Sequence, residues 1–110
     1  MKTNELSGAA LDWAAAKAWQ PVYSDKHLLE HAKAFHPSTD WAHGGPIIER
    51  ESLSLECWRQ GADENTAWAA TRYDQPAISE AYGPTPLIAA MRCYVASRLG
   101  DEVDVPPELT

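Results

Sequence analysis

The sequence predicts an α+β domain, in which an N-terminal and a C-terminal helix pack on a small antiparallel sheet or hairpin. Three observations predict this class: helical spacing of apolar residues near both ends, alternation of apolar and polar residues between them, and a length of 110 residues. Such a chain fits one domain, and 45% hydrophobic residues suffice for a core. We expect residues 1–100 to form the domain and residues 101–110 to form an acidic, proline-containing tail that frays.

The first helix is expected over residues 5–19. Leu6, Ala10 and Trp13 recur at helical spacing, and a run of alanines adds strong helix propensity. Pro21 ends the pattern, because the residue before a proline avoids the helical conformation.

A short second helix is expected next and would carry a histidine pair. His27, Glu30 and His31 fit the H-x-x-E-H pattern, in which two histidines hold Zn²⁺ and the glutamate acts as general base. That enzyme class needs a third ligand on another helix, and the late carboxylates of Glu102 and Glu108 fall in the expected tail. We therefore expect surface histidines and no metal site.

Residues 36–46 are expected to form a loop, because two prolines, a glycine pair and a Ser-Thr-Asp run leave no regular period. Long loops in compact domains often carry function. We take residues 37–50 as the candidate site for a partner or a small ligand. Its candidate contact residues are Ser38, Thr39, Asp40, Trp41, Gly44, Gly45 and Arg50.

Each of these residue types offers a specific interaction. The glycines let a backbone approach a ligand, Trp41 offers a stacking face, and Arg50 can pair with an anion. A structural interpretation of the same residues stays open. In it, Ser38 or Thr39 closes a turn, Asp40 caps a turn or pairs with Arg50, and Trp41 fills the core.

A β-hairpin is expected in the middle of the chain. Leu53, Leu55 and Cys57 alternate with polar residues, which indicates a half-buried strand. Residues 60–65 form a polar turn, and residues 66–73 return as the second strand. The apolar pair just before this hairpin, Ile47-Ile48, is a candidate for an extra short strand.

The last helix is the clearest element, and it follows a predicted loop over residues 75–84 that holds one helical turn. Thr85 caps the helix, Pro86 takes its first position and Gly100 ends it. Its wide apolar face places Met91 and Val95 one turn apart, so both are expected to be nearly fully buried. Cys93 in the same helix is expected to be packed rather than nucleophilic.

The charge of the chain argues against nucleic-acid binding. Nine Lys and Arg against sixteen Asp and Glu give a net charge of −7, and no cationic run that could displace counterions from phosphates exists. An acidic nucleic-acid mimic stays an alternative. It would need most of these residues on one face: Asp63, Glu64, Asp74, Glu80, Asp101 and Asp104.

Other features place the chain in a reducing compartment. Its two cysteines form no CxxC, so we expect free thiols. The N-terminus lacks the apolar core of a secretory signal, and no apolar stretch approaches the roughly 18–20 residues of a membrane span.

Three segments resemble the NinX family of small proteins from lambdoid phages and prophages. They are residues 5–14 (ELSGAALDWA), 37–51 (PSTDWAHGGPIIERE) and 83–97 (GPTPLIAAMRCYVAS). Residues 27–31 and 60–79 are outside the matched stretches. The resemblance implies a phage or prophage origin and the host cytoplasm as location. It implies no catalytic residue, metal or cofactor.

The sequence therefore predicts a non-enzymatic phage accessory protein that binds a host or phage protein or a small ligand through residues 37–50. A small enzyme or nucleotide-binding domain that uses Asp40, Trp41 and Arg50 is the alternative function for the same segment.

Overall fold

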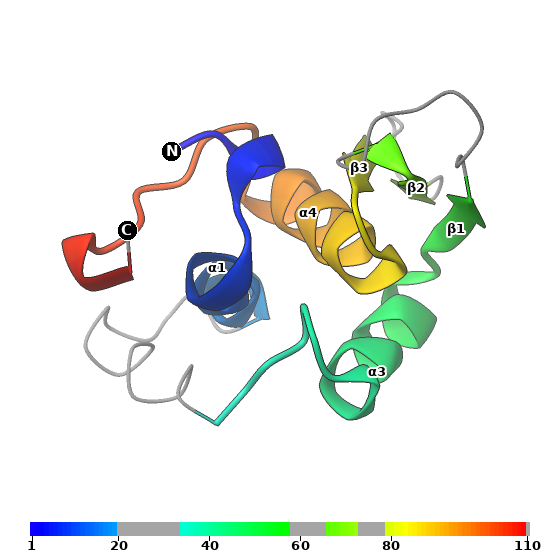
Figure 1. The fold of residues 1–110 in the computed structure, drawn as a ribbon, viewed down its shortest axis with the longest axis horizontal. Coiled ribbons are helices and arrows are strands. Elements are labelled where there is room, and N and C mark those ends of the chain that lie inside the picture. The colour runs from blue at the N-terminus through cyan, green and yellow to red at the C-terminus, as the bar shows by residue number, and fades with distance from the viewer. Residues whose placement is uncertain (20–33, 58–65, 73–78, 110) are drawn as a thin grey trace.

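The computed structural model describes residues 1–19, 34–57, 66–72 and 79–109. It confirms the predicted α+β class. In chain order the described elements are η1 (Thr3–Glu5), α1 (Gly8–Trp19), α3 (Trp41–Glu51), β1 (Ser54–Cys57), β2 (Trp68–Arg72), β3 (Ser79–Gly83), α4 (Pro86–Leu99) and η3 (Pro107–Leu109). Helix α4 lies between α1 and the sheet and contacts every strand (Figure 1).

Helix α1 begins later than the apolar spacing predicts. A single 3-10 turn, η1, comes first, and Leu6 then adopts an extended conformation with its side chain fully buried. The carbonyl oxygen of Leu6 accepts a hydrogen bond from Nε of Arg92 in α4 at 2.8 Å. In a continuous helix, the Leu6 carbonyl would accept a backbone N–H of the same helix. Here it accepts from Arg92 instead. Gly8, at φ +56°, then makes the left-handed turn into α1.

The predicted hairpin is confirmed and belongs to a three-stranded antiparallel sheet in the order β1-β2-β3. Cys57 pairs with Trp68, and Trp68 pairs in turn with Gly83. Strand β3 is where a loop with a helical turn was expected, and that expectation is wrong. Its residues alternate between buried Ala81 and Gly83 and exposed Glu80 and Tyr82. The inward residues are small because α4 lies directly on them.

The predicted burial of alternate residues along β1 is confirmed only in part. Leu53, just before the strand, is buried, and Leu55 is half-buried, but Cys57 is exposed. Strand β1 is at the edge of the sheet, with a partner on one side only. The expected turn over residues 60–65 lies outside the described residues.

Helix α4 follows the sequence prediction closely. The side chain of Thr85 accepts a hydrogen bond from the backbone N–H of Ile88 at 3.1 Å, and Pro86 is the first helical residue. Met91 and Val95 are 0% exposed, which confirms the predicted core face. Helix α4 is buried on most sides because α1, α3 and the sheet surround it.

The predicted loop over residues 36–46 is wrong from residue 41 onward, because this part of the chain forms α3. Asp40 is the N-cap, and Pro46 lies within the helix. The apolar pair that suggested a short strand is helical as well, with Ile47 buried and Ile48 half-buried. Gly-Gly-Pro is typical of a loop. Tertiary packing outweighs that local preference, since α3 buries Ile47 in the common core.

The N-terminal segment pairs with the start of the expected tail. The backbone N–H of Thr3 donates to the carbonyl of Asp101 at 2.8 Å, and that of Val103 donates to the carbonyl of Met1 at 2.9 Å. Lys2 and Glu102 form an antiparallel bridge, and Val103 is buried. Figure 1 shows the two terminal segments side by side.

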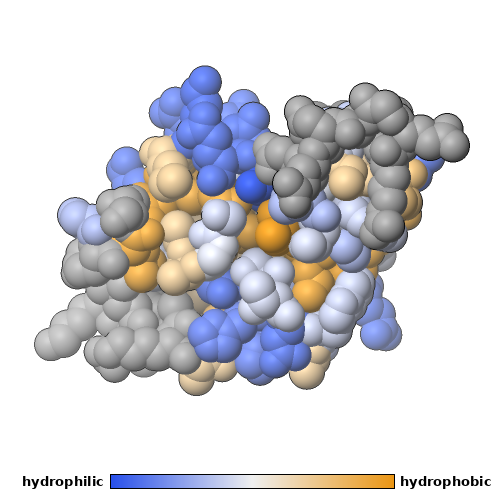
Figure 2. Space-filling view, in the orientation of Figure 1, coloured by the Kyte–Doolittle hydropathy of each residue, from blue (hydrophilic) through white to orange (hydrophobic). Residues whose placement is uncertain are grey.

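The surface of the described residues mixes polar and apolar groups. On the face shown in Figure 2, hydrophobic residues lie in a central band with hydrophilic residues on either side. No helix in the described part of the chain combines the length and the apolar character needed to cross a membrane.

Candidate functional site

The predicted site residues do not form one cluster. Trp41 begins α3 and Arg50 lies in its last turn, so the two are separated by about 13 Å along the helix axis. Ser38 and Gly44 are buried, whereas Thr39, Asp40 and Trp41 are exposed. The candidate segment therefore offers two separate surfaces, one at each end of α3.

Asp40 stabilises the start of α3. Its Oδ1 accepts a hydrogen bond from the backbone N–H of Ala42 at 2.9 Å, which satisfies one of the free N–H groups of the first turn. Of the interpretations left open by the sequence, the structure bears out capping. Arg50, the other partner considered for Asp40, lies at the far end of the helix.

We expect Asp40→Ala to lower the free energy of unfolding by about 1 kcal/mol, since the N-cap bond is lost. Denaturant unfolding measures this loss. Glu49→Ala is the matched control, because it removes an exposed carboxylate from the same helix and should change stability by less than about 0.5 kcal/mol. Equal effects of the two substitutions would show that Asp40 does not act as a cap.

The two glycines of the predicted site differ in their surroundings: Gly44 is closely packed and Gly45 is not. A Cβ built on Gly44 would lie 2.5 Å from the carbonyl oxygen of Pro37 and 2.6 Å from Cδ2 of Leu87 in α4. Gly44 thus allows α3 to approach both segments closely. A Cβ on Gly45 meets nothing within 4 Å. The close approach at Gly44 is to this chain's own residues, whereas the prediction was an approach to a ligand.

A buried carboxylate that the sequence prediction missed holds the segment before α3. Oδ1 of Asp12 in α1 accepts the backbone N–H of Ser38 at 2.9 Å, and its Oδ2 lies 3.5 Å from Nδ1 of His36. The backbone N–H of His36 donates to Nδ1 of His43 at 2.9 Å. The sequence contains one sign of this contact, which is the position of Asp12 within the otherwise apolar run of α1. These contacts hold the segment before α3 against α1 and against the first turn of α3.

A second buried carboxylate lies at the other end of α3. Glu51 is 5% exposed, and three guanidinium groups surround it. Oε2 accepts a hydrogen bond from Nε of Arg50 at 3.0 Å, and Oε1 accepts one from Nη2 of Arg98 at 3.0 Å. Nη1 of Arg72 forms an ion pair with Oε1 at 3.1 Å. We define the arginine cluster as Arg50, Arg72, Arg98 and Glu51. The sequence does not predict this cluster, because its members come from α3, β2 and α4, which are far apart in the chain.

The arginines of the cluster lower the pKa of Glu51. Burial alone raises the pKa of Glu51, but the hydrogen bonds from Arg98 and Arg50 and the positive charges of Arg98 and Arg72 together outweigh burial. The pKa of Glu51 therefore lies below its ordinary value. The carboxylate stays ionised at neutral pH and holds the three arginines together.

Aromatic rings position the two exposed arginines of this cluster. The guanidinium carbon of Arg50 lies 3.3 Å from the ring centroid of Trp19, at the end of α1. Nη2 of Arg50 also donates to the hydroxyl of Tyr94 at 3.3 Å, and Arg98 lies 5.7 Å from the centroid of the Tyr94 ring. Stacking and hydrogen bonding fix both guanidinium groups.

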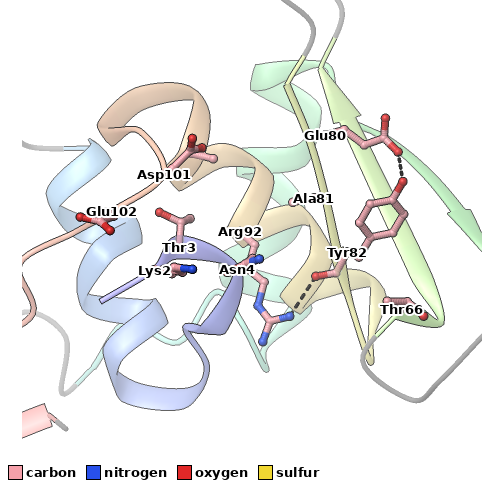
Figure 3. A pocket seen from close by; sticks show the side chains of 11 residues that line it. Lys2, Thr3, Asn4, Thr66, Glu80, Ala81, Tyr82, Arg92, Asp101 and Glu102 are labelled. Carbon is pink, nitrogen blue, oxygen red and sulfur yellow. Dashed lines mark hydrogen bonds between the residues drawn. The ribbon is translucent and has the colours of Figure 1, made fainter.

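A pocket of about 540 Å³ lies between the N-terminal segment, β3 and α4 (Figure 3). Buried Arg92 donates from Nη1 to the carbonyl of Tyr82 at 2.9 Å, and burial lowers the pKa of Arg92. The Tyr82 hydroxyl donates to Glu80, and this bond raises the pKa of Tyr82. The pocket is lined by Lys2, Thr3, Asn4, Thr66, Glu80, Ala81, Tyr82, Arg92, Ala96, Asp101 and Glu102. Carboxylates and cations mix in this lining.

The described residues show a protected thiol and no candidate metal centre. Cys93 is buried, and burial raises its pKa to about 11, so the thiol stays protonated at neutral pH, which confirms the predicted packing role. Within the described ranges, no three His, Cys, Asp or Glu side chains lie close enough to hold a metal ion. His27, Glu30 and His31 lie outside these ranges.

The acidic face required of a nucleic-acid mimic is only partly described. Asp63, Glu64 and Asp74 lie outside the described residues. Glu80 and Asp101 line the pocket between the N-terminal segment, β3 and α4, together with the cations Lys2 and Arg92, and Asp104 is exposed.

Comparison with known proteins identifies the family. The model of a family described as Bacteriophage P22, NinX matches residues 2–98. The chain belongs to the NinX family. This result confirms the resemblance, which rests on three segments that overlap α1, α3 and α4. No curated protein matches the chain. The match covers both ends of α3, and it assigns no residue a role.

Proposed function

We propose that this NinX protein is a non-enzymatic binding module that recognises a protein in the cytoplasm of the bacterial host, and that the first turn of α3 is the contact surface. Trp41 is its central residue, with Thr39 and Asp40 beside it in the sequence. Ser38 and Gly44 support this surface from inside the domain, since both are buried. Gly45 leaves the adjacent turn open.

The exposure of Trp41 carries the proposal. Its side chain is 55% exposed, the largest value among the large hydrophobic residues that the structure describes. Leaving a tryptophan in water forgoes the favourable burial of a large apolar surface. Tryptophan is also among the residue types that dominate binding energy at protein interfaces. The N-cap bond of Asp40 holds the backbone on either side of Trp41, so a partner meets a preorganised backbone at this position.

The charge of the chain indicates the chemistry of the partner surface. Net charge is −7, and the exposed carboxylate of Asp40 lies directly before Trp41 in the sequence. A partner that presents an apolar pocket bordered by lysines or arginines would match both features. The absence of any cationic run in the sequence disfavours nucleic acid as the direct ligand.

The test combines affinity capture with a defined binding measurement. Wild type, Trp41→Ala and Tyr82→Ala are used as bait in extracts of infected host cells, and each candidate partner is then purified and titrated. Tyr82 in β3 is a matched control, because it is another exposed aromatic residue away from α3. We expect Trp41→Ala to weaken binding about 30-fold or more, as for an interface hot spot of about 2 kcal/mol. Tyr82→Ala should leave binding unchanged.

Stability measurements separate this result from misfolding. Because Trp41 is exposed, Trp41→Ala should change the free energy of unfolding by no more than about 0.5 kcal/mol. A partner that binds Trp41→Ala as tightly as wild type would contradict the proposed surface. A loss of about 3–5 kcal/mol in stability would show instead that Trp41 is a core residue.

A further inference from the structure

We propose that Arg50 and Arg98 form a binding site for a phosphate-type oxyanion at the junction of the C-terminal ends of α3 and α4. The site lies at the opposite end of α3 from Trp41 and requires no protein partner. It therefore stands independently of the proposed function.

The charge at this junction is unusual for so acidic a chain. Glu51 carries one negative charge, whereas the two exposed arginines alone carry two positive charges, before buried Arg72 is counted. The side chains of Arg50 and Arg98 are each 44% exposed. An anion can therefore reach both from solvent, and a phosphate group supplies the negative charge that the junction attracts.

Both arginines retain hydrogen-bond donors that point to no described residue. Arg98 donates one bond, from Nη2 to Glu51. Arg50 donates from Nε to Glu51 and from Nη2 to Tyr94. Among the residues that the structure describes, Nη1 of each arginine and Nε of Arg98 have no acceptor. Guanidinium donors of this kind match the several oxygens of a tetrahedral oxyanion.

The two guanidinium groups are already held close together. Both bond to the carboxylate of Glu51, so the bonded nitrogens are no more than about 8 Å apart. Trp19 stacks on Arg50 and fixes the plane of that group. An oxyanion bound by both arginines would order few additional side-chain rotamers, which lowers the cost of binding.

The test is a titration of the full chain with inorganic phosphate, at constant ionic strength maintained with sodium chloride. The arginine Nε–H and tryptophan Nε1–H signals are followed by NMR. We expect saturable shifts at Arg50, Arg98 and Trp19, which share the junction. Arg98→Gln should weaken phosphate binding about tenfold or more, because it removes charge-assisted hydrogen bonds. Lys2→Gln removes the same charge at the N-terminal segment and should leave affinity unchanged.

Further ligands identify the source of the oxyanion. Acetate should bind more weakly than phosphate, and adenosine should not bind. Equal affinities for phosphate and adenosine monophosphate would indicate recognition of the phosphate group alone. Tighter binding of the nucleotide would indicate a phosphoryl group carried by a larger molecule. Arg50→Gln replaces Arg98→Gln as the test variant if the latter does not fold. The proposal is overturned if phosphate gives no saturable shift, or if Lys2→Gln weakens binding as much as the arginine variant.

Discussion

Glu51→Gln is expected to lower the free energy of unfolding by about 3 kcal/mol. Removal of one partner from a buried ion pair costs about 3–5 kcal/mol, and Glu51 and Arg72 are both buried. The lower end of that range applies here, since Arg50 and Arg98 are half-exposed and regain water. The substitution keeps the volume of the side chain, so the loss reports charge and hydrogen bonding rather than packing. Denaturant unfolding at neutral pH measures it.

Glu49→Gln is the matched control for this experiment. It removes an exposed carboxylate two positions earlier in α3 and should change stability by less than about 0.5 kcal/mol. A loss of that small size in Glu51→Gln as well would show that the three guanidinium groups do not depend on the Glu51 carboxylate.

The same carboxylate predicts a pH dependence with a definite sign. The pKa of Glu51 is lowered in the folded protein, so the unfolded chain binds this proton more tightly. Its contribution to stability is therefore complete above the ordinary carboxyl pKa of about 4.3 and is lost as pH falls through the lower folded value. Glu51→Gln should lack this part of the acid-induced loss. Parallel stability curves for the two proteins between pH 5 and 2 would contradict the assignment.

Met91→Ala is expected to cost about 2–5 kcal/mol in the free energy of unfolding. The Met91 side chain is 0% exposed in the helix that α1, α3 and the sheet surround. Its truncation removes buried methylene groups and the thioether sulfur and leaves a cavity that the neighbouring elements fill only in part. Thermal or denaturant unfolding gives the value.

Leu99→Ala provides the comparison on the same helix. Leu99 is half-buried in the last turn of α4, so its truncation removes less buried surface and should cost clearly less than that of Met91. A loss below about 0.5 kcal/mol for Met91→Ala would mean that the core assignment of α4 is wrong.

Elements with strong local signals were predictable from the sequence. Thr85, Pro86 and Gly100 mark the ends of α4, and the apolar residues between them specify its buried face. The alternation beginning at Leu53 predicted the first strand. Each of these signals depends on neighbouring residues in the sequence, so no knowledge of distant segments is needed.

Elements with weak local signals depended on distant contacts. The Gly-Gly-Pro run in α3 resembles a loop, but Asp40 caps a helix there, and Gly44 lets that helix lie against Pro37 and Leu87. Strand β3 contains small residues of low strand propensity, and Gly83 fits because Ala89 of α4 lies against it. At Gly44 and Gly83, the neighbouring segment leaves no room for a side chain, and that segment is distant in the sequence or belongs to another element.

By itself, the sequence determined the α+β class, the central helix α4, the NinX family and the acidic charge of this protein. The tertiary structure decided which polar residues act together. Asp12 meets Ser38 across 26 residues, and Arg98 meets Glu51 across 47. Sequence spacing carries no record of such pairs, because they form only when α1, α3 and α4 pack. The same packing separated Trp41 from Arg50, since a helix between two residues fixes them at opposite ends.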